Sequence, residues 1–282
     1  IRRGGTVVFP TETVYGLGAD ATSAEAAEKI YKAKGRPSDN PLIIHIAAPE
    51  DAAKYAFTDE TYEKLARTFM PGPLTVILPS RPVIPQETRG GLPTVAVRCP
   101  SDPIAHRLIE YSGVPIAAPS ANLSGAPSPT HAAHVVDDMN GRVDMIIDGG
   151  DSAFGLESTI VKVEDDGSLI LLRPGKITLE DLRRVVGRVS VSDAVTGALK
   201  PGEKVLSPGM KYRHYAPKAP VFLLDGTPEE KIRYISGQGT EHVAVLAYRE
   251  EAADFHRALP EVTVYDFGSR ADTAMQAHTL FY

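Results

Sequence analysis

The chain has 282 residues, 30 of them basic and 36 acidic, so its formal net charge is −6. Proteins that bind nucleic-acid phosphates over a broad surface are more often basic, which disfavours a dedicated nucleic-acid-binding function. The single cysteine, Cys99, excludes an intrachain disulfide and favours a reducing, cytoplasmic setting. No run approaches ~18 consecutive apolar residues, so no membrane-spanning helix and no membrane partner are expected.

The first 188 residues alternate short apolar runs with amphipathic segments, which predicts an α/β domain whose sheet is faced by helices. Strands are expected at residues 6–9, 42–46, 74–78, 94–97, 114–118, 145–147 and 158–163. Helices are expected at residues 23–33, 59–69, 102–111, 130–137 and 178–186. Ser23 stands where an N-cap is needed, and Ala27, Ile30 and Tyr31 share one face of the first helix.

Residues 189–218 are polar and contain glycine and proline, which predicts an interdomain linker. Residues 219–282 carry three apolar runs, VFLLD, HVAVLAY and VTVYDF, separated by helix-like segments at 228–236 and 250–259. This alternation predicts a small, parallel, Rossmann-like α/β domain. No GxGxxG follows a strand there, so the pattern gives no support for a dinucleotide site.

A first polar stretch, KGRPSDNP, runs from Lys34 to Pro41 between a predicted helix and a predicted strand. Its two prolines stiffen the turn, and Gly35 lets a ligand approach the backbone. Lys34 and Arg36 held on such a turn would neutralise a polyphosphate. The alternative is a basic helix C-terminus that complements the helix dipole, and the pattern alone favours neither interpretation.

A second stretch, AAPSANLSG, spans residues 117–125 and follows the predicted strand VPIAA. Loops at the carboxyl ends of strands are where open α/β sheets bind ligands. Ser120, Asn122, Ser124 and Ser128 offer hydroxyl and amide groups without bulk. Serine and asparagine also fill ordinary turns, and taken alone this stretch favours that simpler interpretation.

Polar residues also stand singly at the ends of apolar runs. Those at predicted strand ends are Thr11, Thr13, His45, Thr94, Arg98, Ser158 and Arg173. An arginine rarely ends a buried apolar run unless it is paired, so Arg98 and Arg173 indicate either an anionic ligand or an acidic partner in the chain. His45 within LIIHI is by default a hydrogen-bonded core histidine. No HExxH, cysteine–histidine cluster, GxSxG or Walker A sequence occurs.

Several of these stretches, in the same order, resemble one known family. Lys34-x-Arg36 with Ser120-x-Asn122 resembles the KxR…SxN signature of the YrdC-type threonylcarbamoyl-AMP synthases. The stretches that carry the likeness are FPTETVYGLGADA, KGRPSDNPLIIHI, PGPLT, AVRCP, APSANLSG and GLESTI. They cover residues 1–186, and SPGMKYRHYAP (residues 207–217) resembles the linker of the two-domain members. The resemblance implies a YrdC-like twisted sheet with a concave active face.

The resemblance also implies an activity. The family's nucleotidyltransferase reaction converts L-threonine, bicarbonate and ATP into threonylcarbamoyl-AMP, pyrophosphate and water. The product serves N6-threonylcarbamoyladenosine formation in tRNAs that read ANN codons, completed by downstream tRNA threonylcarbamoyl-transfer proteins. Mg²⁺ is expected to arrive with ATP. Direct binding of double-stranded RNA is a second partner to weigh, and the net charge disfavours it.

Carried over position by position, the resemblance assigns three sets of residues. The catalytic set is Lys34, Arg36, Ser120 and Asn122. The threonine-binding set is Thr11, His45, Arg98 and Ser158. The ATP-binding set is Lys34, Ser38, Thr94, Ala118, Ser120, Ser128, Arg173 and, from a linker that would close over the nucleotide, Tyr212, His214 and Tyr215. Two rivals stay open: an RNA-binding module, and a carbamoyl-transfer domain of the hydrogenase-maturation type.

Overall fold

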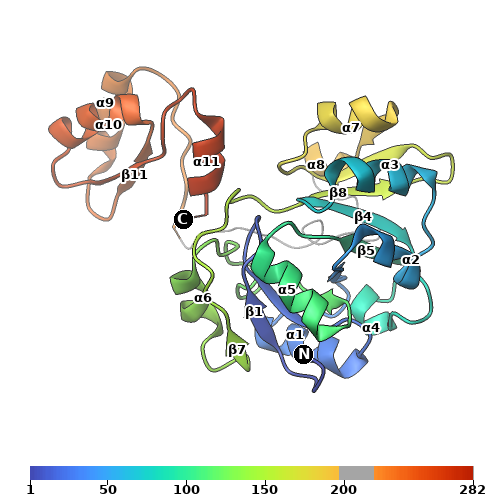
Figure 1. The fold of residues 1–282 in the computed structure, drawn as a ribbon. Helices are drawn as coiled ribbons and strands as arrows, with labels where there is room; N and C mark the ends of the chain where they lie inside the picture. Colours follow the sequence, from blue (N-terminus) through green and yellow to red (C-terminus); the bar gives the residue numbers. More distant parts are fainter. Residues whose placement is uncertain (197–218, 282) are drawn as a thin grey trace. The chain divides into compact units, whose positions relative to one another are not determined.

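In the computed structural model, which describes residues 1–196 and 219–281, the chain divides into two units, Ile1–Ala216 and Pro217–Tyr282. The first unit is built on a mixed sheet (Figure 1). Its strands are β1 (Val7–Phe9), β2 (Gly16–Asp20), β3 (Ile43–His45), β4 (Leu74–Pro79), β5 (Thr94–Arg98), β6 (Ile116–Ala117), β7 (Met145–Ile146), β8 (Thr159–Val163), β9 (Leu169–Arg173) and β10 (Val189–Val191). Their order across the sheet is β10-β9-β8-β4-β5-β3-β6-β2-β1-β7.

Helices cover this sheet. They are α1 (Ala24–Lys34), α2 (Ala52–Tyr55), α3 (Glu60–Phe69), α4 (Gln86–Arg89), α5 (Pro103–Ser112), α6 (Ala132–Met139), α7 (Leu179–Val186) and α8 (Asp193–Thr196), with a 3-10 turn at Pro49–Asp51. The Ser23 side chain caps α1 by accepting from the Ala26 N–H, and Gly35 ends it in the left-handed conformation. Helices α3 and α7 lie side by side over β4 and β8 (Figure 1).

The alternation of side chains along the central strands separates a core face from a site face. Ile44 of β3 and Val97 of β5 belong to the main core, which also holds Tyr15, Leu17 and Ile30. The residues next to these along each strand point to the opposite face of the sheet. There a smaller cluster forms from Ile43, Ile77, Ala96, Ile160 and Leu172. Because side chains two apart share a face, His45 and Arg98 continue the rows of Ile43 and Ala96 at the ends of β3 and β5.

Strand register then brings three polar residues together. Parallel pairing of β3 with β5 sets His45 opposite Arg98, and antiparallel pairing of β4 with β5 sets Thr75 opposite Arg98. Strand β8 runs parallel to β4 and places Ile160 opposite Thr75, so the segment before β8 enters at the same edge. The fold therefore concentrates polar strand ends on one face of an otherwise apolar sheet.

Three strands of the first unit lie outside the strand ranges expected from the sequence: β2, β10, and β9, which is the apolar run that ends at Arg173. The segment GLGAD forms β2 without any β-branched residue, and a Cβ at Gly18 would lie 2.6 Å from both Phe9 and Ile116. Only glycine fits that close approach. Residues 189–191, expected in the linker, instead form β10 and extend the sheet beside β9, with Val189 buried.

The second unit pairs two parallel strands, β11 (Ala244–Ala247) and β12 (Thr263–Asp266). Its helices are α9 (Pro228–Gln238), α10 (Arg249–Ala258) and α11 (Thr273–Thr279). The expected strand at VFLLD is wrong: residues 221–225 form no strand, and Leu223 is 99% exposed. An apolar run without a neighbouring strand gains no ladder hydrogen bonds. No described helix has the length and apolar composition needed to span a bilayer.

Candidate active site

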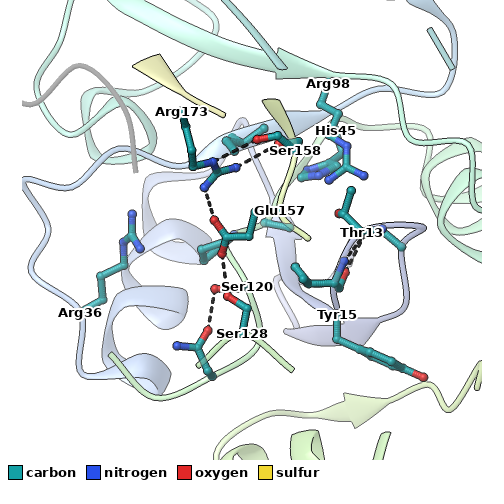
Figure 2. A pocket seen from close by; sticks show the side chains of 17 residues that line it. Thr13, Tyr15, Arg36, His45, Arg98, Ser120, Ser128, Glu157, Ser158 and Arg173 are labelled. Carbon is teal, nitrogen blue, oxygen red and sulfur yellow. Dashed lines mark hydrogen bonds and ion pairs between the residues drawn. The ribbon is translucent and has the colours of Figure 1, made fainter. Parts of the chain in front are cut away.

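A pocket opens on the site face of the first unit's sheet (Figure 2). Its lining includes Thr11, Thr13, Val14, Tyr15, Gly16, Arg36, Ile43, His45, Arg98, Ala118, Pro119, Ser120, Asn122, Ser128, Glu157, Ser158 and Arg173. Three arginines stand among them against one carboxylate, so the pocket is suited to anions.

The structure brings together most of the residues expected from the sequence. Those that line the pocket are Thr11, Arg36, His45, Arg98, Ala118, Ser120, Asn122, Ser128, Ser158 and Arg173. Lys34, Ser38 and Thr94 are not among its lining residues. Ser38 is exposed on the turn after α1, and Thr94 begins β5, at the opposite end of that strand from Arg98. Tyr212, His214 and Tyr215 lie outside the described residues.

Lys34 lies behind the pocket and braces one of its loops. Its side chain is buried at the last turn of α1 and donates to the carbonyl oxygens of Ser120 and Asn122, each at 2.5 Å. A third, longer contact of 3.4 Å reaches the Asn122 side-chain oxygen. Burial, followed by the neighbouring Arg36, holds the pKa of Lys34 well below its usual value. In this structure the lysine therefore fixes the loop that carries Ser120 and Asn122.

The loop of residues 120–126 is held by its own side chains as well. The Ser120 hydroxyl donates to Asn122 Oδ1 at 2.5 Å. The Asn122 amide nitrogen donates to the carbonyl oxygens of Leu123 at 2.8 Å and Ala126 at 2.7 Å. Arg36 belongs to the adjoining turn, where its Nη2 donates to the Pro41 carbonyl at 3.1 Å. This side of the pocket is thus a pair of turns held by hydrogen bonds to main-chain carbonyls.

A network of four polar residues forms a second side. Arg173, at the end of β9, donates to Ser158 Oγ at 3.0 Å and to the Ser158 carbonyl at 3.0 Å. Its Nη1 also pairs with Glu157, whose other oxygen accepts from the Ser128 hydroxyl at 2.6 Å. Figure 2 shows Glu157 between Arg173 and Ser128. Glu157 was not among the residues expected from the sequence, where it stands directly before Ser158 in GLESTI.

Arg98 and His45 make up the deeper side. Arg98 is 4% exposed and pairs with Glu12, whose Oε1 lies 2.8 Å from Arg98 Nη2. Burial, with Arg98 beside it, lowers the pKa of His45 to about 3, so the imidazole is neutral. Its Nδ1 is buried without a hydrogen-bond partner among the described residues. A buried polar atom of this kind, on a pocket wall, is free to bond a ligand.

Two threonines complete the deeper side of the pocket. The Thr11 hydroxyl donates to the Val14 carbonyl at 2.6 Å and lies 2.9 Å from the Thr13 hydroxyl. Ser158 Oγ lies 2.8 Å from Thr75 Oγ1. The deeper side therefore pairs one cation with several hydroxyls and a neutral imidazole, which suits a small molecule carrying a carboxylate and further polar groups. The Arg36–Arg173 side, with more cations, suits a larger anion.

Two family models match the chain. One, described as "Telomere recombination", covers residues 1–175, and the other, described as "Threonylcarbamoyl-AMP synthase, C-terminal domain", covers residues 177–282. A threonylcarbamoyl-AMP synthase of Pyrococcus abyssi is 51% identical over 83% of this chain and 68% of its own length. One from Bacillus subtilis is 49% identical over 89% of this chain and 73% of its own length.

A solved structure is also similar to this chain. The chain resembles that of Pyrococcus abyssi Sua5 crystallised in complex with L-threonine, with a TM-score of 0.87 and 44% sequence identity. The match covers 100% of this chain and 81% of the solved one.

Proposed function

Because the chain belongs to the family of two-domain YrdC-type threonylcarbamoyl-AMP synthases, we propose that its pocket makes threonylcarbamoyl-AMP from L-threonine, bicarbonate and ATP. The observation that carries this proposal is the division of one pocket into two anion-binding sides. One side, around Arg98, is small and rich in hydroxyls, and the other, around Arg36 and Arg173, has more positive charge. An amino acid and a nucleotide that bind side by side need two such regions, one for a carboxylate and one for phosphates.

The amino acid is assigned to the deeper side. Arg98 would bind the threonine carboxylate through parallel hydrogen bonds from its planar guanidinium. His45 Nδ1, which has no partner among the described residues, and the hydroxyls of Thr11 and Ser158 would contact the amino and hydroxyl groups. Hydroxyl partners discriminate against valine, because valine would leave them without a hydrogen bond.

ATP is assigned to the other side. Arg36 and Arg173 would bind the phosphates, and Ser120, Asn122 and Ser128 would bind polar atoms of the nucleotide. Lys34 would contribute by holding the loop of Ser120 and Asn122 in place. The ATP-binding roles of Ser38, Thr94, Tyr212, His214 and Tyr215 remain proposals that rest on the family resemblance.

The chemistry requires positioning more than covalent help. The threonine nitrogen attacks bicarbonate, water is lost, and an oxygen of the resulting carbamate attacks the α-phosphorus of ATP. Holding the three reactants side by side replaces two bimolecular encounters with steps inside one complex. Negative charge grows on the departing pyrophosphate, and the fixed arginines stabilise it as it develops.

Mg²⁺ is proposed to enter with ATP. This cation is usually held by substrate phosphates together with one or two carboxylates. Among the described pocket residues, Glu157 supplies one carboxylate for that purpose. When bound, the ion would neutralise charge on the triphosphate. The product would then pass to tRNA threonylcarbamoyl-transfer proteins, which modify adenosine in tRNA.

One assay tests the proposal. Pyrophosphate release from ATP is measured with threonine and bicarbonate each omitted in turn, and the adenylate is identified by mass spectrometry. We expect release only when both are present. Replacing ATP with carbamoyl phosphate tests the carbamoyl-transfer alternative, and turnover on carbamoyl phosphate without threonine would overturn the proposal.

A further inference from the structure

We propose that Glu12 is a positioning residue that holds the Arg98 guanidinium from outside the pocket and thereby sets the affinity for the substrate carboxylate. The inference rests on the proposed function, because it takes that carboxylate to belong to threonine. Arg98 lines the pocket and Glu12 does not, although the two charges are 2.8 Å apart. Glu12 therefore acts on a substrate through the arginine.

The backbone around Glu12 explains this placement. Its neighbours Thr11 and Thr13 both line the pocket, while Glu12 between them lies behind Arg98. The Glu12 carbonyl accepts from the Phe154 N–H at 2.8 Å, and the Thr11 hydroxyl bonds the Val14 carbonyl. These bonds fix the loop, so the carboxylate presents one position to the guanidinium. One short segment thus supplies pocket hydroxyls on one side and a counter-charge on the other.

The charges near Arg98 make Glu12 its principal partner. His45, opposite Arg98 in the strand register, is neutral because its pKa is lowered to about 3. Asp102 accepts from the N–H groups of Ile104 and Ala105 at the start of α5, and burial raises its pKa. Both side chains of the Glu12–Arg98 pair are 5% exposed. Glu12 is therefore the charged group that can hold this guanidinium in one position.

The hydrogen bonds of this pair are incomplete. Both carboxylate oxygens of Glu12, and Nε and Nη2 of Arg98, are buried without a hydrogen bond of regular geometry among the described residues. The ion pair therefore balances charge while leaving guanidinium N–H groups unused. An incoming carboxylate would offer this guanidinium an acceptor of regular geometry. Glu12 positions the arginine without consuming its donors.

The test uses the full chain and two substitutions at one position. Glu12→Gln removes the charge at nearly constant size, and Glu12→Asp keeps the charge on a shorter side chain. Threonine and ATP dissociation constants are measured by calorimetry, and KM and kcat by pyrophosphate release. We expect Glu12→Gln to weaken threonine binding by about tenfold or more, with ATP affinity changed less than twofold and kcat preserved at saturating threonine. Glu12→Asp should fall between it and the wild type.

A matched control and a double variant separate positioning from folding. Glu251→Gln removes a carboxylate that pairs with Lys231 and Arg270 in the second unit, and should leave the threonine constant unchanged. In an Arg98→Lys background, Glu12→Gln should cost much less, because the guanidinium that it positions is gone.

Four outcomes would overturn the inference. One is a lower melting temperature with an unchanged threonine constant, which would mean that Glu12 serves folding alone. Equal losses for threonine and ATP would indicate a general distortion of the pocket. Should Glu12→Gln fail to fold, wild-type threonine affinity in Glu12→Asp would contradict the role. A wild type that binds no threonine would overturn the proposed threonine site as well.

Discussion

The pocket balances its two inner arginines in different ways. Arg98 is paired with a carboxylate outside the pocket lining, and both side chains are 5% exposed. Arg173 is paired with Glu157, which itself lines the pocket, and these side chains are 15% and 12% exposed. A ligand can therefore approach Arg98 without displacing its partner, whereas a nucleotide that reaches Arg173 meets Glu157. The Arg98–Glu12 pair therefore keeps a small recognition site in one geometry. At Arg173, a nucleotide phosphate must compete with the Glu157 carboxylate.

The largest effect is expected from a substitution of Lys34, which supports the loop on the nucleotide side of the pocket. Lys34→Met keeps the length of the side chain but leaves the Ser120 and Asn122 carbonyls without their donor. Each buried acceptor left unbonded costs ~1–3 kcal/mol. We expect a clearly lower melting temperature and nearly complete loss of adenylate formation. Thermal unfolding and pyrophosphate release measure the two.

A Lys34→Met protein of wild-type stability with no activity would contradict this bracing role. It would place the ammonium on the phosphates instead. Lys32→Met, on the exposed side of the same helix, is the matched control and should change neither measurement.

On the Arg98 side, we expect the next largest effect from Arg98→Lys. A lysine cannot make two parallel hydrogen bonds to a carboxylate. Losing a charge-assisted bond of ~1.5–3 kcal/mol should weaken threonine binding by about 10- to 100-fold, with little change for ATP. Isothermal titration with threonine, serine and valine measures it. If threonine affinity is unchanged, or if valine binds as well as threonine to the wild type, the contrast between the two sides fails.

Acid should lower the free energy of unfolding, because His45 is buried in its neutral form. The pKa of this histidine is lowered from 6.5 to about 3 in the folded protein. Its contribution to stability is therefore complete above pH 6.5 and is lost as the pH falls towards 3, because only the unfolded chain takes up the proton. The slope is at most about 1.4 kcal/mol per pH unit.

Denaturant unfolding between pH 6.5 and 4.5 measures this dependence. His45→Gln should flatten the curve, and the exposed His256→Gln should not. A wild-type curve that is already flat over this range would show that the imidazole takes up a proton without unfolding.

The smallest effect is expected at Glu157. Glu157→Gln keeps an acceptor for Ser128 and removes the charge that faces the nucleotide. Without Mg²⁺, ATP should bind a few-fold more tightly, in keeping with the ~1 kcal/mol of a partly solvated charge pair. With Mg²⁺ the gain should vanish. Glu164→Gln, which removes the partner of Lys162 outside the pocket lining, is the control. Weaker binding in both conditions would mean that Glu157 orients Arg173 rather than competing with ATP.

The sequence predicts most of the sheet because its central strands are continuous apolar runs bounded by turn residues. It does not predict β2, whose GLGAD residues serve close packing against Phe9 and Ile116 rather than β-propensity. It wrongly predicts a strand at VFLLD, because pairing depends on a neighbour that local sequence does not reveal.

The candidate site shows a similar division. Residues that end strands, such as Arg98 and His45, could be predicted because alternation places them on one face. Glu12 and Glu157 could not, since an acid beside a serine or threonine is common in loops. Only the tertiary structure shows which arginine each acid faces. Lys34 carries a signature position, yet its direction, towards main-chain carbonyls and out of the pocket lining, depends on the loop after β6.

The use of arginines as the pocket's cations protects the enzyme from acylation by its own product. A carbamoyl adenylate is an activated acyl compound, and an unprotonated amine beside it would be acylated. The cations among the described pocket residues are arginines, which stay protonated and are poor nucleophiles. Lys34, whose lowered pKa would otherwise make it reactive, has its nitrogen turned towards carbonyl oxygens behind the loop. The enzyme can thus hold its product without becoming the product's target.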